Sequence, residues 1–158
     1  MPIDIRSYLF GFQVGRRTLL KNNSFIGNHV GIQLPGDDAA VSAAQRIEGN
    51  TIVGNDYAGF EIVAASQNVA ITGNNIYGNG VNGINTAAGS ASGCGIVDFA
   101  GPLVNATNNF WGVESGPGTD SANKAGPGSG CDLGSGHTQV QPFAKAPFLL
   151  APVTATWR

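Results

Sequence analysis

The fold is decided by QRIEGNTIVGNDYAGFEI, residues 45–62, because the chain repeats this stretch. A similar stretch, VAITGNNIYGNGVNGINT, follows at residues 69–86, and another, LLKNNSFIGNHVGIQL, precedes it at residues 19–34. A degenerate last copy, VNATNNFWG, covers residues 104–112. A repeat with a period in the twenties is typical of a solenoid, in which each unit forms one coil and stacks on the next.

Each unit contains three short apolar stretches, which in residues 45–62 are centred on Ile47, Ile52 and Phe60. Glycine or asparagine bounds each stretch, and none is long enough or suitably periodic for a helix. Three strands per coil with tight corners describe a parallel β-helix. The sequence therefore predicts an all-β solenoid of about four to five short coils with an irregular C-terminal cap.

One asparagine of each unit is expected at a corner of the coil. Asparagine and glycine adopt the left-handed backbone conformation that sharp bends require. In stacked coils the side-chain amides of these asparagines would form a hydrogen-bonded ladder, whereas the alternative is that they are ordinary loop residues. The predicted ladder residues are Asn23, Asn50, Asn74 and Asn108, with spacings of 27, 24 and 34 residues.

The N-x-[IF]-x-G-N units, and the closing run at residues 106–112 followed by Ser115-Gly116-Pro117-Gly118, resemble a known family. The chain is similar, over residues 9–150, to the right-handed parallel β-helix repeat proteins, the pectin-lyase-like fold of carbohydrate-associated bacterial proteins. That fold hosts lyases, hydrolases, epimerases, adhesins and binding modules, so the resemblance implies a fold more specifically than an activity. It also implies a secreted or cell-surface location, although no signal peptide is visible in the sequence.

Composition narrows the classes of function. The 158 residues suit one domain, and only 11% of them are charged while 24 are glycine, as expected for a solenoid. The formal net charge of −2 argues against a nucleic-acid partner. No apolar stretch of about twenty residues is present, so we expect no membrane span.

The single domain, residues 1–158, is expected to hold its coils in residues 9–112, with an insertion at 87–103 and a loop and C-terminal cap at 113–158. No helix precedes the first strand, so the first coil would expose open strand edges that invite another chain to pair. We therefore predict a homo-oligomer formed through this end, in which residues 2–7 folding back as a plug is the alternative. The contact would involve Ile3, Ile5, Leu9 and Phe10.

A polar stripe is predicted on one sheet. Side chains alternate along a strand, so the polar residue between two inward apolar residues must point outward. The residues in this position are Gln13, Gln33, Glu61 and Asn85. Such a stripe suits the hydroxyls of an extended poly- or oligosaccharide, and the resemblance places a substrate groove along this sheet. The alternative is an ordinary solvated sheet face.

Catalysis would need acidic residues that lie together. A glycoside hydrolase uses two carboxyl groups on either side of one bond, and the candidates are Glu61 with Asp37, Asp38 or Asp98. The Asp37-Asp38 pair is also the candidate for calcium, while no transition-metal ligand spacing occurs and no other cofactor is expected. These acids are scattered over different units, which departs from the catalytic patterns of the family.

Two cysteines, Cys94 and Cys131, lie in glycine- and serine-rich loops on either side of the last coil. They either form a disulfide, which for a loop of this length contributes roughly 3–4 kcal/mol, or remain two free thiols. For the whole chain the sequence favours a glycan-binding or accessory module. A self-assembling structural domain is the second alternative, and a polysaccharide lyase, hydrolase or epimerase is the third.

Overall fold

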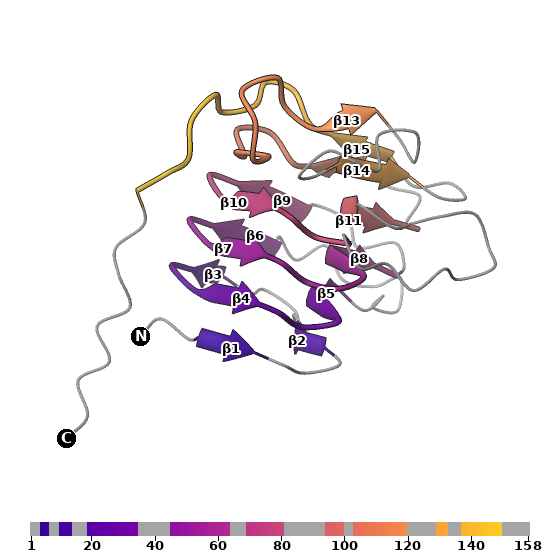
Figure 1. The fold of residues 1–158 in the computed structure, drawn as a ribbon. Coiled ribbons are helices and arrows are strands. Elements are labelled where there is room, and N and C mark those ends of the chain that lie inside the picture. Colours follow the sequence, from indigo (N-terminus) through magenta and orange to yellow (C-terminus); the bar gives the residue numbers. More distant parts are fainter. Residues whose placement is uncertain are drawn as a thin grey trace.

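The described strands form three parallel sheets, which are the three sides of a coiled stack (Figure 1). The structure is a computed structural model that describes residues 4–6, 10–13, 19–34, 45–63, 69–80, 94–99, 103–119, 129–132 and 137–149. Side chains are not described for residues 4–6, 10–13, 118–119, 129–132 and 137. Within the described residues no helix is long and apolar enough to cross a membrane.

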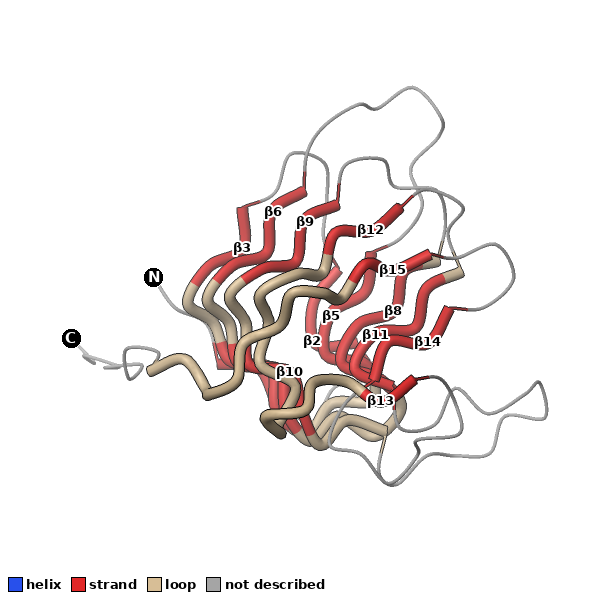
Figure 2. Tube along the Cα trace, turned by 90° about the horizontal axis from the view of Figure 1, so that it is seen from above, coloured by secondary structure: helices blue, strands red, loops and turns tan. Residues whose placement is uncertain are grey.

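From β1 to β12 the chain visits the three sheets in turn, one strand in each, and β13 and β14 then both belong to sheet B. Sheet A contains, in spatial order, β1 (Asp4–Arg6), β4 (Ser24–Ile26), β7 (Thr51–Val53) and β10 (Asn75–Tyr77). Sheet B contains β2 (Phe10–Gln13), β5 (Val30–Leu34), β8 (Ala58–Ile62), β11 (Cys94–Asp98), β14 (Ser129–Asp132) and β13 (Gly118–Thr119). Sheet C contains β3 (Leu19–Lys21), β6 (Gln45–Glu48), β9 (Val69–Thr72), β12 (Leu103–Asn105) and β15 (His137–Gln139). Figure 2, which is seen from above, shows strands of one sheet following one another along one side of the stack.

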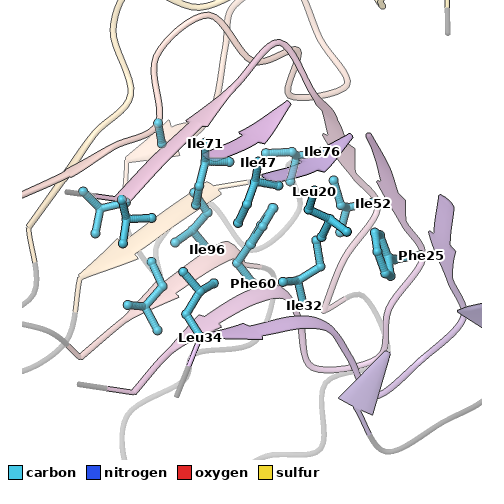
Figure 3. Close-up of a cluster of buried hydrophobic side chains, with 14 of the residues drawn as sticks. Leu20, Phe25, Ile32, Leu34, Ile47, Ile52, Phe60, Ile71, Ile76 and Ile96 are labelled. Atoms are coloured by element: carbon cyan, nitrogen blue, oxygen red, sulfur yellow. The ribbon is translucent and has the colours of Figure 1, made fainter. Parts of the chain in front are cut away.

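The core is built from columns of apolar side chains, because the register stacks equivalent residues of successive coils. In sheet A, Phe25 aligns with Ile52 and Ile52 with Ile76. In sheet B the corresponding residues are Ile32, Phe60 and Ile96, and in sheet C they are Leu20, Ile47 and Ile71. All nine are buried and meet inside the coil (Figure 3). Burying each side chain contributes about 1.5–3 kcal/mol.

A ladder of buried asparagines runs along the corner between sheets C and A. The backbone N–H and the side-chain amide of Asn23 donate to Oδ1 of Asn50, at 2.9 and 3.1 Å. Asn50 donates in the same way to Asn74, and Asn74 to Asn109. Asn109 therefore holds the last position of this ladder, and the prediction of Asn108 is wrong by one residue.

The error at Asn108 has a conformational cause. The residue before each ladder asparagine adopts a left-handed conformation, with φ of 62° at Gly49 and 57° at Asn108. Asn108 is the exposed bend residue, whereas the side chain of Asn109 is buried. The chain thus separates two tasks that the sequence analysis assigned to one asparagine: the left-handed bend and the hydrogen-bonded ladder.

A second ladder, which the sequence analysis missed, runs along the corner between sheets A and B. The backbone N–H of Asn28 donates to Oδ1 of Asn55 at 3.0 Å, and that of Asn55 donates to Oδ1 of Asn79 at 3.1 Å. The signal was present, because Asn28, Asn55 and Asn79 repeat with the same spacings of 27 and 24 residues as the first ladder. Among the described residues, two of the three corners of the stack therefore carry an asparagine ladder.

The first coil begins earlier than predicted. Strand β1 pairs in register with β4, so residues 4–6 extend sheet A and do not fold back across the end as a plug. The coils therefore begin by Asp4 and not at residue 9. In the described part of the chain, β1, β2 and β3 are the outermost strands of sheets A, B and C at this end.

The break in the period is also resolved differently from the prediction. Residues 83–86, expected to form a regular strand of the stack, lie outside the described residues. Strand β11, which falls within the predicted insertion at 87–103, pairs in register with β8 and is a regular strand of sheet B. The supposed insertion thus supplies part of the fourth coil.

The C-terminal residues lie against the last coil. Val140 and Phe143 pack on the core, and the side-chain amide of Asn75 exchanges two hydrogen bonds with the backbone of Phe148, at 3.0 and 2.9 Å. Strands β13, β14 and β15 continue sheets B and C in this region, where an irregular loop and cap were expected. Part of the segment expected as a cap is therefore strand.

Candidate functional site

The outer face of sheet B carries two of the polar residues that the repeat singles out, Gln33 and Glu61. Gln13 aligns with Gln33, and Gln33 with Glu61, on the neighbouring strands β2, β5 and β8 (Figure 1). The side chains of Gln33 and Glu61 are half-buried, while the residues on either side of each point into the core and are fully buried. These two polar groups therefore face outward from successive coils.

Gln33 and Glu61 are joined by a short hydrogen bond. Nε2 of Gln33 donates to Oε2 of Glu61 at 2.7 Å. A bond to an ionised acceptor is stronger than one between neutral groups, so it holds both side chains in one arrangement. The other carboxylate oxygen of Glu61 receives no hydrogen bond from the described residues.

The stripe is shorter than predicted. The position beside Glu61 on the next coil belongs to Val97 of β11, which is fully buried. Asn85, the residue expected there, lies outside the described residues. The stripe of Gln33 and Glu61 is therefore bounded on the β11 side by an apolar residue and not continued by an amide.

Two aromatic rings precede the same two strands. His29 and Tyr57 stand directly before β5 and β8, and their rings stack with centroids 5.4 Å apart and planes 25° apart. Tyr57 also packs against Ala58, Cys94 and Val97. Sequence analysis gave His29 no role, although it lies 28 residues before Tyr57, the same offset that separates Gln33 from Glu61.

The Tyr57 hydroxyl is affected by its surroundings. Burial, and after it the negative charge of Glu61, raise the pKa of Tyr57 above its ordinary value. The hydroxyl therefore stays protonated at neutral pH and remains a hydrogen-bond donor next to this face. Tyr77, by contrast, belongs to sheet A, where it meets Phe110 edge-on with ring centroids 6.1 Å apart.

The other acidic candidates do not join Glu61 on this face. Asp98 aligns with Ile62 of the core, is fully buried, and accepts a hydrogen bond of 3.1 Å from the Thr138 hydroxyl. Its proposed pairing with Glu61 across an outer groove is therefore wrong, because alternation along β11 turns its side chain inward. Asp37 and Asp38, the candidates for calcium, lie outside the described residues.

The remaining candidates of the sequence analysis are a metal site and a disulfide. No group of three histidine, cysteine, aspartate or glutamate side chains that could hold a metal ion occurs in the described part of the chain. Cys94, at the start of β11, is disulfide-bonded, and Cys131 is the only other cysteine in the sequence. The pairing of these two cysteines stays a prediction.

Comparison with known proteins identifies the fold family and no individual relative. The family described as "right handed beta helix region" matches residues 7–111. No curated protein and no solved structure matches the chain.

Proposed function

The chain belongs to the right-handed β-helix family, and we propose that it is a binding or accessory module that holds an extended sugar chain on the outer face of sheet B. The observation that carries this proposal is the Gln33–Glu61 pair, with Gln13 aligned beside it on β2. A strand spacing of about 4.8 Å sets the backbone positions of Gln13 and Glu61, which are two strands apart, about 10 Å from each other. A face of this size contacts a short segment of a glycan.

The chemistry of the pair suits hydroxyl groups. An amide both donates and accepts, and a carboxylate accepts strongly, so together they can bond several hydroxyls of one sugar. The hydrogen bond between them and the rigid coils behind them fix the arrangement before a ligand arrives. Preorganisation of this kind reduces the entropic cost of binding.

Replacing Glu61 with alanine is expected to weaken glycan binding by about tenfold or more, since a hydrogen bond to a charged group contributes about 1.5–3 kcal/mol. Isothermal titration calorimetry against a panel of oligosaccharides measures the change. Glu48→Ala is the matched control, because Glu48 is a partly exposed glutamate of sheet C. Equal affinities of the wild-type and Glu61→Ala proteins would contradict the proposal, as would a wild-type protein that binds no glycan.

Self-assembly is the second candidate function. At one end of the stack three strands, β1, β2 and β3, are the last members of their sheets in the described chain. Such edges present backbone donors and acceptors to another chain. Light scattering after size exclusion is expected to give the mass of a dimer or larger species, and a monomer at high concentration would contradict this candidate.

Catalysis has the least support. Glu61 is the only carboxylate among the outward residues described on β5, β8 and β11, whereas hydrolysis of a glycosidic bond uses two. A lyase, hydrolase or epimerase activity therefore remains the third alternative, and the described strands of this face offer no second carboxylate to carry it.

A further inference from the structure

Two exposed apolar side chains lie on the same face as Glu61. Val63 and Phe99 directly follow β8 and β11, and 45% of Val63 and 40% of Phe99 is exposed. The backbone N–H of Phe99 donates to the carbonyl of Ile62 at 2.9 Å, and that of Val63 donates to Leu34 at 3.0 Å. These bonds continue the register of sheet B for one more residue, which places Phe99 beside Val63 on neighbouring coils.

Alternation then relates these residues to the polar pair. Val63 is two residues beyond Glu61, so the two side chains leave the sheet on the same side and about 6.7 Å apart along the strand. Phe99 is two residues beyond Val97 and lies one coil further on. The outer face of sheet B thus has a polar column, Gln33 and Glu61, next to an apolar pair, Val63 and Phe99.

From this arrangement we infer the class of sugar that the face accepts, which is a neutral sugar chain. One ring of the chain stacks on Phe99, and hydroxyls of the chain are bonded by Glu61 and Gln33. The inference rests on the proposed function and adds to it a stacking residue and a preference. A pyranose ring has an apolar face of C–H groups and a rim of hydroxyls, which matches an exposed aromatic ring beside a polar column. Aromatic side chains supply much of the contact energy in binding sites.

The negative charge of the face is the reason why we expect it to prefer a neutral sugar chain. Glu61 contributes a negative charge, and no lysine or arginine is present among the described residues of β5, β8 and β11. A chain of uronic acids would bring a carboxylate close to Glu61, and like charges at short distance repel. A neutral hexose or pentose chain meets no such repulsion.

The test compares a neutral hexasaccharide of xylose or glucose with hexagalacturonate by calorimetry, at one ionic strength. We expect the wild-type protein to bind the neutral chain more tightly, and Phe99→Ala to lose about tenfold or more of this affinity. Phe99→Tyr, which keeps the ring, is expected to retain it. Leu19→Ala is the matched control, because Leu19 is an equally apolar side chain, 60% exposed, on sheet C.

A charge variant separates stacking from repulsion. Glu61→Gln keeps the size of the side chain and removes its charge, so it is expected to narrow the difference in affinity between the neutral and the uronic acid chains. The inference is overturned if hexagalacturonate binds as tightly as the neutral chains, or if Phe99→Ala binds like the wild type while Glu61→Ala does not. In either case the proposed function survives, whereas a wild-type protein that binds neither probe overturns both.

Discussion

Replacing Gly59 with alanine is expected to lower the free energy of unfolding by about 3 kcal/mol, near the upper end of the usual range for overpacking a core. A Cβ atom at Gly59 would lie 2.6 Å from the carbonyl oxygen of Gly95 and 2.9 Å from Nδ2 of Asn79. Neither neighbour can swing aside, since one is backbone of β11 and the other belongs to the second asparagine ladder. Urea unfolding followed by far-ultraviolet circular dichroism measures the change.

The control for Gly59→Ala is a substitution at Gly54, where glycine suits the backbone conformation and no neighbouring atom is close. Gly54 has φ of 65°, and nothing lies within 4 Å of the position of a Cβ atom. Asparagine tolerates this conformation, so Gly54→Asn is expected to cost about 1 kcal/mol or less. If the two variants were equally stable, the close approach of β8 and β11 at Gly59 would not be what requires glycine there.

Replacing Asn50 with alanine is expected to destabilise the fold by about 3–5 kcal/mol, because each buried group left without a partner costs about 1–3 kcal/mol. Oδ1 of Asn50 accepts two bonds from Asn23, and its Nδ2 donates to the carbonyl groups of Leu20 and Glu48 at 2.9 and 3.1 Å. A loss of this size is a large part of the total stability of a domain, which is about 5–15 kcal/mol.

Thermal and urea unfolding of Asn50→Ala test the ladder, with Asn108→Gly as the control. Asn108 is exposed and has φ of 57°, so glycine fits its conformation and a change within about 0.5 kcal/mol is expected. A loss below 1 kcal/mol in Asn50→Ala would show that backbone pairing and the apolar columns hold the coils without the amide ladder.

Much of the fold was predictable because a solenoid repeats its local rules. The apolar columns follow from the recurrence of Phe25, Ile52 and Ile76 at equivalent positions of successive units, and no long-range information is needed to align them. The alignment of Gln33 with Glu61 follows from the same repeat. In such a fold, residues at equivalent positions of successive repeats are also neighbours in space.

The failures arose where the period was ambiguous. Residues 83–85 and 95–97 both begin with Gly-Ile. From the sequence, either could have been the strand that pairs with β8 on the next coil of sheet B. The structure uses the strand that contains Gly95. A Cβ atom added to Gly95 would lie only 2.7 Å from a ring atom of Trp111, so glycine is required there. Contact with Trp111 of the next coil is a long-range feature, so the local pattern could not identify the strand.

The candidate site was only partly visible in the sequence for a related reason. Alternation turns Glu61 outward and Asp98 inward, but the direction of Asp98 depends on the register of β11, which the sequence analysis did not find. Phe99 was missed as a surface residue for the same reason. Once β11 is in place, Phe99 follows from the same alternation as Glu61.

Titration of the protein with a neutral hexasaccharide, followed through the chemical shifts of the backbone amides, tests whether the outer face of sheet B binds a sugar chain. We expect the largest changes in chemical shift at Gln33, Glu61, Val63 and Phe99, and no change at Arg46 and Glu48 on sheet C. Shifts that move mainly on another sheet, or no change at saturating concentrations of sugar, would contradict binding at this face.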